Sequence, residues 1–305
     1  MSAPALKFEE VTRRFGRVTA LNRVSLAVEP GTVLGLMGRN AAGKTTALRL
    51  AHGILYADGG SIRVLGLDPA KEGMEVRTRV SLLSEEPSLY PWMTVQEIIR
   101  FSSALHPNWD PDLAESYRKK LDLNPSARIG TLSRGNKAKA ALLLAVSSRP
   151  EILLLDDPTA SLDPLARREV LEGILEAIPA EGGAVVYASH LVGDIERVAD
   201  RIALLDEGRL RFADPLDALK KRVKRVTAVF ENEIPAKVSL PGLIDSTGDG
   251  RLLILTLENP DDGTAEALRS MGARNVSIDA LSLEDILVAY LRQGIEPEKE
   301  EVRHV

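Results

Sequence analysis

The chain has 305 residues, of which 44% are hydrophobic and 27% charged, and its formal net charge at pH 7 is -5. This composition excludes disordered and fibrous classes, and no apolar run approaches the ~20 residues needed to cross a bilayer. The chain contains no cysteine, which excludes disulfides and thiol chemistry. The negative charge and the 4% of aromatic residues disfavour nucleic acid as the main partner. The first residues lack the apolar core of a secretion signal, so we expect a cytoplasmic protein.

Alternating apolar residues predict strands over 6–11 and 18–28, and an apolar run predicts a third strand over 32–37. The third strand leads into a glycine-containing segment that fits G-x-x-x-x-G-K-[ST], and a helix-like run over 46–50 follows it. Strand, loop and helix are the context that this motif requires, so we expect its backbone N–H groups to surround the phosphates of a nucleotide. Lys44 would reach the outer phosphates, and the Thr45 hydroxyl would bind Mg²⁺. The motif comprises Gly38, Arg39, Asn40, Ala41, Ala42, Gly43, Lys44 and Thr45.

The chain then continues as an α/β domain to about residue 220. Strands are predicted over 62–66 and 80–83, and helices over 94–105, 111–121 and 136–148, so that a helical subdomain occupies about 92–148. Short apolar runs over 152–155 and 184–188 are typical of buried parallel strands. The runs 202–205 and 209–212 flank Asp206-Glu207-Gly208, which predicts a hairpin.

A basic run over 219–225 marks a domain boundary, although a solvated helix end is an equally good interpretation of its charge. Beyond it, strands over 226–230, 252–257 and 276–279 and helices over 264–271 and 283–293 predict a small α+β domain, residues 221–295. No ligand motif occurs there, and we interpret the domain as a dimer brace or a filler. Residues 296–305 form a charged tail.

Two acidic residues, Asp156 and Asp157, end the apolar strand over 152–155. Two acids after a strand also occur as a helix cap or a turn, but the phosphate loop in the same chain favours a functional interpretation. Asp156 is then the candidate ligand of Mg²⁺. Asp157 is the candidate for orienting or deprotonating an attacking water.

Five elements follow one another in a specific order: the phosphate loop, Leu132-Ser133-Arg134-Gly135-Asn136, the acidic strand, Ser161-Leu162-Asp163 and Ser189-His190. Over residues 5 to about 215, this order resembles the ATP-binding subunit of ATP-binding cassette (ABC) transporters, nearest to the exporter-like (ABC-2-type) subfamily with a short C-terminal domain. The resemblance implies a P-loop NTPase core with an antiparallel β subdomain and a helical subdomain. It implies an ATPase that works with ATP and Mg²⁺ as a head-to-tail dimer. Its partners would be transmembrane permease subunits, so the chain would lie on the cytoplasmic face of the membrane, and a homodimer and a heterodimer both stay open.

The resemblance also assigns roles by position. Phe15 looks like the aromatic residue that stacks on adenine, although a lone phenylalanine more often lies in a core. Ser133 and Gly135 would face the γ-phosphate bound by the other subunit, where a helix N-terminus suits an anion. The other residues carried over are Thr46 beside the phosphates, Asp163 for communication across the dimer, and His190 at the γ-phosphate.

Three departures from the family pattern concern binding. Ala41 replaces a glycine of the loop, which costs roughly 1 kcal/mol if the position needs a positive φ. Glu85 stands where a glutamine binds Mg²⁺ and touches the membrane subunit. A carboxylate can still hold Mg²⁺, and a plain acidic turn formed with Glu86 is the alternative. Arg134 and Asn136 alter the signature but leave Ser133 and Gly135.

The fourth departure concerns hydrolysis, because Asp157 stands where the family has its catalytic glutamate. Aspartate is one methylene shorter, roughly 1.5 Å, and a misplacement near 1 Å costs on the order of 100-fold in rate. We therefore expect ATP binding with slow hydrolysis, unless a bridging water or a backbone shift restores the distance.

The alternative function is a soluble ABC-type ATP switch that acts on a protein or nucleic-acid complex with little hydrolysis. Such proteins usually carry two cassettes or long coiled-coil or zinc insertions. This chain has one cassette, no heptad run and no cysteine, which favours the transporter subunit.

Overall fold

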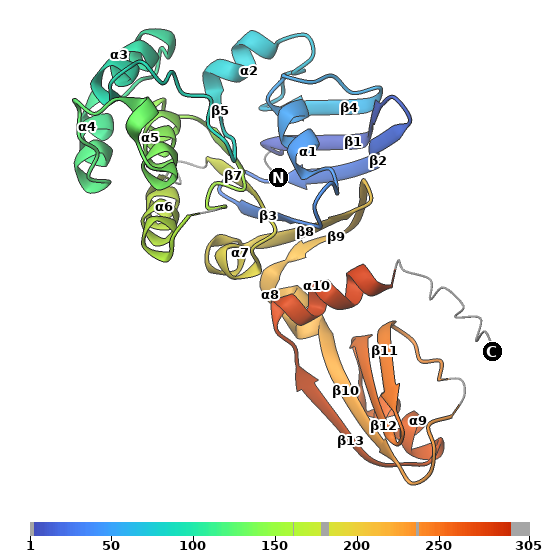
Figure 1. The fold of residues 1–305 in the computed structure, drawn as a ribbon. Helices are drawn as coiled ribbons and strands as arrows, with labels where there is room; N and C mark the ends of the chain where they lie inside the picture. Colours follow the sequence, from blue (N-terminus) through green and yellow to red (C-terminus); the bar gives the residue numbers. More distant parts are fainter. Residues whose placement is uncertain (1–2, 161, 178–182, 236–237, 294–305) are drawn as a thin grey trace, which may run out of the picture. The chain divides into compact units, whose positions relative to one another are not determined.

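The structure is a computed structural model, and it describes residues 3–160, 162–177, 183–235 and 238–293. The chain forms two compact units, Met1–Ala213 and Asp214–Val305 (Figure 1). The predicted boundary near residue 220 falls inside α8 (Leu216–Arg222), a helix of the second unit. The predicted tail, 296–305, lies outside the described residues.

A six-stranded sheet forms the centre of the first unit. Its spatial order is β5 (Val80–Leu83), β6 (Ile152–Asp156), β7 (Ala184–Ser189), β3 (Val33–Met37), β8 (Arg201–Asp206) and β9 (Arg209–Pro215). The first five strands pair in parallel. All residues of β3, β6 and β7 are buried, and this is why these strands have continuous apolar sequences. Because β6, β7 and β3 are neighbours, the loops after them meet at one edge of the sheet.

A second sheet has three strands, in the order β2 (Val18–Val28), β1 (Leu6–Phe15) and β4 (Gly59–Val64). Both pairings are antiparallel. Inward side chains such as Phe8 and Leu21 share one core with α1 (Lys44–Ala51) and the central sheet. The expected antiparallel subdomain is therefore present, and its core supports the helix that follows the phosphate loop.

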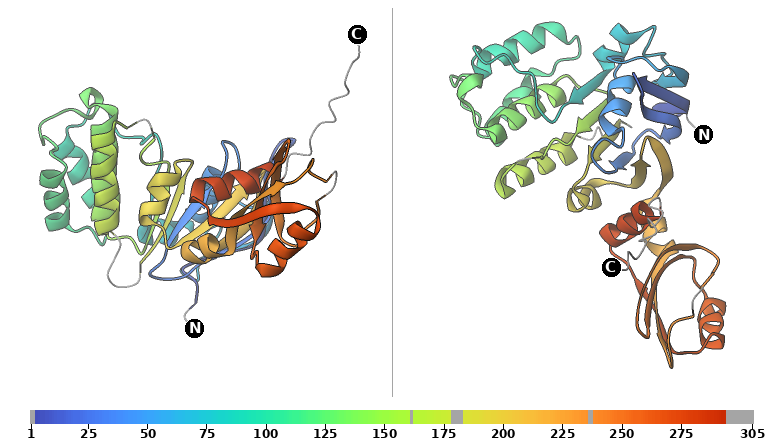
Figure 2. Two further views of the ribbon diagram at one scale, coloured as in Figure 1. Left: turned by 90° about the horizontal axis from the view of Figure 1, so that it is seen from below. Right: turned by 45° about the vertical axis from the view of Figure 1, so that its right-hand side comes forward.

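Helices α3 (Val95–Leu105), α4 (Pro111–Lys120), α5 (Arg134–Ser147) and α6 (Pro164–Ala177) gather away from the antiparallel sheet (Figure 2). Side chains of Thr94, Asp110 and Ser133 cap the first three, as sequence preferences favour. Helix α6 was not predicted, although Val170 and Ile174 are buried at helical spacing. The shorter helices of this unit are η1 (Ile129–Thr131), α2 (Gly73–Arg79) and α7 (Val192–Val198).

The second unit is built on a four-stranded antiparallel sheet with the order β11 (Leu243–Asp249), β12 (Leu252–Glu258), β10 (Val223–Phe230) and β13 (Ala273–Ala280). Leu268 of α9 (Asp262–Ser270) packs with one face of the sheet. Helix α10 (Leu283–Arg292) contacts side chains on the other face of the sheet. Arg292 forms an ion pair with Asp245, and the Tyr290 hydroxyl donates a hydrogen bond to Glu258. Strand β11 was missed because only one of its residues, Ile244, is buried.

Candidate nucleotide-binding site

The phosphate loop connects the end of β3 to the start of α1, as predicted. Gly43 precedes the helix with φ of 107°, and a Cβ there would lie 2.5 Å from the Ala20 carbonyl oxygen. No other residue type fits this position without moving the backbone of β2. Ala41 has φ of 64°, so the condition for its predicted cost, roughly 1 kcal/mol, is met.

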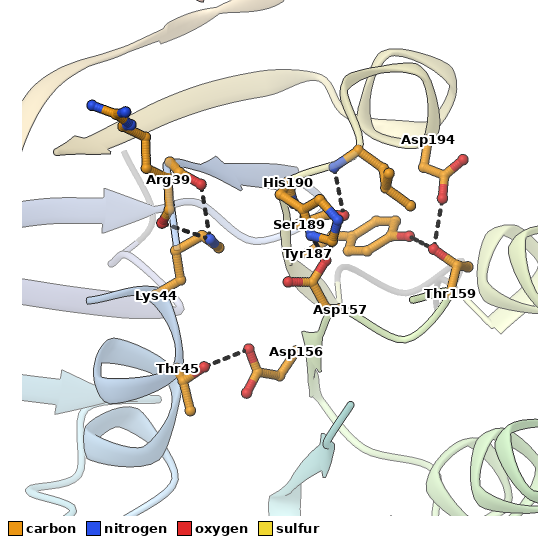
Figure 3. A network of polar contacts seen from close by, with 12 residues as sticks. Arg39, Lys44, Thr45, Asp156, Asp157, Thr159, Tyr187, Ser189, His190 and Asp194 are labelled. Atoms are coloured by element: carbon orange, nitrogen blue, oxygen red, sulfur yellow. Dashed lines mark hydrogen bonds and ion pairs between the residues drawn. The ribbon is translucent and has the colours of Figure 1, made fainter. Parts of the chain in front are cut away.

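Lys44 is the first residue of α1, and its side chain folds back over the loop (Figure 3). Its Nζ donates hydrogen bonds to the carbonyl oxygens of Gly38, at 2.8 Å, and Arg39, at 3.2 Å. Burial lowers the pKa of Lys44, while the nearby Asp157, Asp156 and Glu85 act in the opposite direction. A buried ammonium group held by two carbonyls is poised to bind an anion that enters the loop.

Thr45 and Asp156, the two predicted ligands of Mg²⁺, are brought together although 111 residues separate them in the sequence. The Thr45 hydroxyl donates to Asp156 Oδ1 at 2.9 Å (Figure 3). Burial is the main cause that raises the pKa of Asp156, and the Thr45 hydrogen bond opposes it. A hydroxyl and a carboxylate are hard oxygen donors, and Mg²⁺ prefers such donors. The donor set fits the ion that the sequence predicted.

Asp157 has a different environment from its neighbour. Its φ is 46°, and its backbone N–H donates to the Ala188 carbonyl at 2.8 Å. Its Oδ1 is 2.8 Å from Ser189 Oγ, which donates to it, and 3.0 Å from His190 Nδ1 (Figure 3). The backbone N–H of His190 donates to the same oxygen at 3.3 Å. Asp157 and His190, predicted from separate motifs, therefore form one cluster.

A buried polar network behind this cluster was not predicted. Thr159 Oγ1 donates to Asp194 Oδ2 at 2.6 Å and lies 3.0 Å from the Tyr187 hydroxyl (Figure 3). Because the single hydroxyl hydrogen of Thr159 is used on Asp194, the Tyr187 hydroxyl donates to Thr159. Burial is the largest of the causes that raise the pKa of Tyr187. The network links the loop after Asp157 to the strand before His190 and to α7.

The predicted signature residues lie at helix N-termini. Ser133 caps α5, because its Oγ accepts from the Asn136 N–H at 3.2 Å, and Gly135 lies in the first turn. Asp163 precedes α6, and its Oδ1 accepts from the Leu165 and Ala166 N–H groups at 3.0 and 2.9 Å. The Ser133 and Asp163 side chains thus accept hydrogen bonds from some of the backbone N–H groups that have no partner within each helix.

Glu85 lies on the turn after β5 and is exposed. It lines a cavity of about 250 Å³. Glu86 joins it on the acidic wall, while Arg134 and Lys137 of α5 supply positive charge. The structure thus brings two departures from the family pattern, Glu85 and Arg134, to the same cavity with opposite charges.

Phe15 does not lie in a core, because 44% of its surface is exposed. The Arg13 guanidinium carbon lies 4.6 Å from the centre of its ring. One face of the ring is therefore engaged in a cation–π contact. No role for Arg13 was predicted from the sequence. Its contact with Phe15 depends on the two-residue alternation of β1 and on a side-chain rotamer, and no sequence motif indicates either.

Comparison with known proteins identifies relatives of the chain. The family model described as ABC transporter matches residues 21–160. The ABC transporter ATP-binding protein YtrB of Bacillus subtilis (strain 168) is 25% identical over 284 residues, which are 93% of this chain and 97% of that protein. The Nod factor export ATP-binding protein I of Paraburkholderia xenovorans (strain LB400) is 33% identical over 68% of this chain and 70% of its own length. A solved structure of the ATP-binding subunit of an ABC transporter superposes with a TM-score of 0.66 at 25% identity, covering 71% of this chain and 92% of that one.

Proposed function

The chain belongs to the family of ABC transporter ATP-binding proteins, which are ATPases, and from this premise we propose that it powers an exporter by ATP-driven head-to-tail dimerisation with slowed hydrolysis. One observation carries the proposal. The phosphate loop, the Thr45–Asp156 pair and the Asp157–His190 cluster follow three neighbouring strands of one sheet. A nucleotide held by the loop places its outer phosphate beside both acids.

The binding residues act on the phosphates of ATP. Backbone N–H groups of the loop and of α1 surround the anion, and Lys44 exchanges its bonds to the Gly38 and Arg39 carbonyls for bonds to phosphate oxygens. Thr45 and Asp156 would hold Mg²⁺, with Glu85 as a further ligand. When it is bound, Mg²⁺ neutralises charge on the phosphates. Phe15 offers its free face to the adenine.

Asp157 orients or deprotonates the attacking water, and His190 contacts the γ-phosphate. Oδ1 of Asp157 is used by Ser189 and His190, and within the described residues no hydrogen bond reaches Oδ2, which stays available to the water. The same bonds hold the short carboxyl against β7, so it cannot move toward the phosphate without losing them. This restraint, added to the missing methylene, supports slow hydrolysis.

A second subunit completes the site. The N-terminus of α5, with Ser133 and Gly135, faces the γ-phosphate bound by the other subunit, and Asp163 responds to the contact between them. In a homodimer, both sites carry Asp157 and the altered signature. In a heterodimer, Asp157 weakens one site while the signature serves the other.

The membrane partner binds at an exposed aromatic cluster, Tyr90, Trp92 and Phe101. The ring centres of Tyr90 and Trp92 are 5.1 Å apart, and those of Tyr90 and Phe101 are 5.4 Å apart. Trp92 keeps 65% of its surface exposed. Within the described residues, no helix is long and apolar enough to cross a membrane. We therefore assign transport to separate permease subunits, which hold the chain on the cytoplasmic face of the membrane. The proposed direction of transport, out of the cell, is supported by the Paraburkholderia relative, whose name describes it as an export protein.

The test is co-purification from the native membrane followed by an ATPase assay of the complex. The proposal expects membrane proteins to co-purify with the chain and expects ATPase activity that Lys44→Ala abolishes. Trp92→Ala should release the chain from the membrane fraction and leave ATP binding intact. Recovery with ribosomes or DNA instead of membranes would contradict the proposal.

A further inference from the structure

Strand β13 forms one edge of the sheet in the second unit. It pairs with β10 from Ala280, opposite Lys224, to Ala273, opposite Phe230. Among the described residues, no strand pairs with its other side. Backbone N–H and C=O groups of alternate residues therefore point away from the sheet, and such a row is a template for another strand.

The middle of this edge lacks the features that usually prevent pairing. Native edge strands are protected by proline, charged side chains or a bulge. Between Asn275 and Ile278 there is no proline and no charged residue, and the irregularity in pairing lies at the Ala273 end. Ile278 is 40% exposed, while Val276, which shares its face of the sheet, packs against the core.

An antiparallel pairing of β13 with itself, centred on Ser277, is self-complementary. It places Val276 of each copy opposite Ile278 of the other, and Asn275 opposite Asp279. Opposite side chains of an antiparallel pair lie on the same face, as the alternation along β13 requires. Each exposed isoleucine then gains an apolar neighbour, and each Asp279 carboxylate gains an amide donor.

Other pairings are less suitable. A register centred on Val276 places Arg274 opposite Ile278, which sets a charge against an apolar side chain. The opposite edge of the sheet, β11, would place Asp245 opposite Asp249 on both sides of a centre at Thr247, and like charges in that position repel. We propose that β13 pairs with β13 of a second copy of this chain, in the register centred on Ser277, and that this contact does not require ATP.

The absence of cysteine from the chain makes a direct test possible. The full chain with Ser277→Cys has one thiol, and the proposed two-fold axis brings it next to its counterpart. Mild oxidation without nucleotide should give a disulfide-linked dimer on a non-reducing gel. Thr247→Cys, an exposed position on β11, is the matched control and should stay monomeric.

Two further measurements fix the register and separate this contact from the ATP-dependent dimer. Asn275→Cys and Asp279→Cys should each stay monomeric alone and form a linked dimer when mixed. Adding Lys44→Ala to Ser277→Cys should leave the dimer unchanged, whereas adding Ile278→Asp should abolish it while the circular dichroism melt stays the same. Equal cross-linking of Ser277→Cys and Thr247→Cys, or cross-linking that needs ATP, would overturn the proposal without affecting the proposed function.

Discussion

The two acids that end and follow β6 are adjacent in sequence, yet they belong to two different halves of the proposed nucleotide site. Asp156 ends a regular strand and accepts one hydrogen bond, from Thr45 of the phosphate loop. Asp157 has a left-handed backbone and accepts three hydrogen bonds at one oxygen, from Ser189 and His190. The change in backbone conformation turns the second acid toward β7. We call residues 38–46 with Asp156 the binding half, and Asp157, Ser189 and His190 with the Thr159–Tyr187–Asp194 network the hydrolysis half.

In the proposed function, binding and hydrolysis therefore depend on different kinds of structure. Apart from Asp156, the binding half consists of backbone amides, a helix start and one buried lysine, all within a short segment. The hydrolysis half depends on side-chain hydrogen bonds from the segment after β6 to β7 and α7, between residues that lie 32 and 35 positions apart in the sequence. Substitutions in the first half should affect binding, and those in the second should affect kcat.

The largest effect is expected for Lys44→Ala. Loss of the buried ammonium removes the main positive charge at the phosphates, so kcat/KM for ATP should fall on the order of 1,000-fold. ATPase assays of the complex and binding of a fluorescent ATP analogue measure this fall. Lys119→Ala, on the exposed side of α4, is the control and should change neither. If Lys44→Ala binds the ATP analogue normally, the lysine does not contribute to nucleotide binding.

Asp157→Asn should reduce kcat by about 100-fold, because an amide cannot accept the proton of the attacking water. KM for ATP should stay within about threefold of the parent, since the binding half is untouched. Steady-state kinetics give both values. A rise in KM with unchanged kcat would mean that Asp157 belongs to the binding half.

Asp157→Glu should raise kcat by about 10-fold, because the added methylene lets the carboxylate approach the phosphate. The same kinetics measure it, with Asp163→Glu as a control for adding a methylene elsewhere on the proposed interface. A decrease would show that the surroundings of Asp157 have adapted to aspartate.

Tyr187→Phe should have a smaller effect, a loss of about 1 kcal/mol in the free energy of unfolding, because the Thr159 oxygen loses its donor. We expect a few-fold decrease in kcat as well, since the loop after Asp157 loosens. Tyr117→Phe is the matched control, because its buried hydroxyl donates to the Gly173 carbonyl at 2.8 Å in the helical group. It should cost similar stability, measured by urea unfolding, without changing kcat. Equal kcat values for both variants would make the Tyr187 network purely structural.

The smallest effect is expected for Ala41→Gly. Relief of the left-handed alanine should increase the free energy of unfolding by about 0.5–1 kcal/mol, and kcat should not change. Thermal melts of the nucleotide-free chain measure the gain. Ala138→Gly, inside α5, should destabilise instead, so the sign separates local strain from a general effect of glycine.

The sequence predicts the arrangement of the proposed binding half well, because local spacing determines it. Strand β3, the loop and α1 are contiguous, and the Thr45–Asp156 pair follows once both motifs are placed at the same edge of one parallel sheet, where only β7 lies between β3 and β6. The hydrolysis half was predicted in part. Asp157 and His190 came from motifs, but Ser189 had no role, and Tyr187, Thr159 and Asp194 gave no signal. Tyr187 looks like one more apolar residue of a buried strand, and its hydroxyl partner lies 28 residues away.

The same contrast applies to the fold. The buried strands β3, β6 and β7 have continuous apolar sequences and were predicted. Strand β11 has one buried residue and no apolar run, so its place in the sheet depends on pairing with β12 rather than on its own pattern. The family and its α/β architecture were predicted correctly, whereas contacts between distant side chains needed the structure.

The contact between Arg13 and Phe15 bears on which nucleotide the proposed site would select. A ring held by a cation on one face presents only its other face, and every base has a surface that can stack there. The strength of stacking depends on the area of the base, and stacking does not distinguish the hydrogen-bonding edges of different bases. We expect the Phe15 ring to discriminate purines from pyrimidines by size, and to accept guanine nearly as well as adenine.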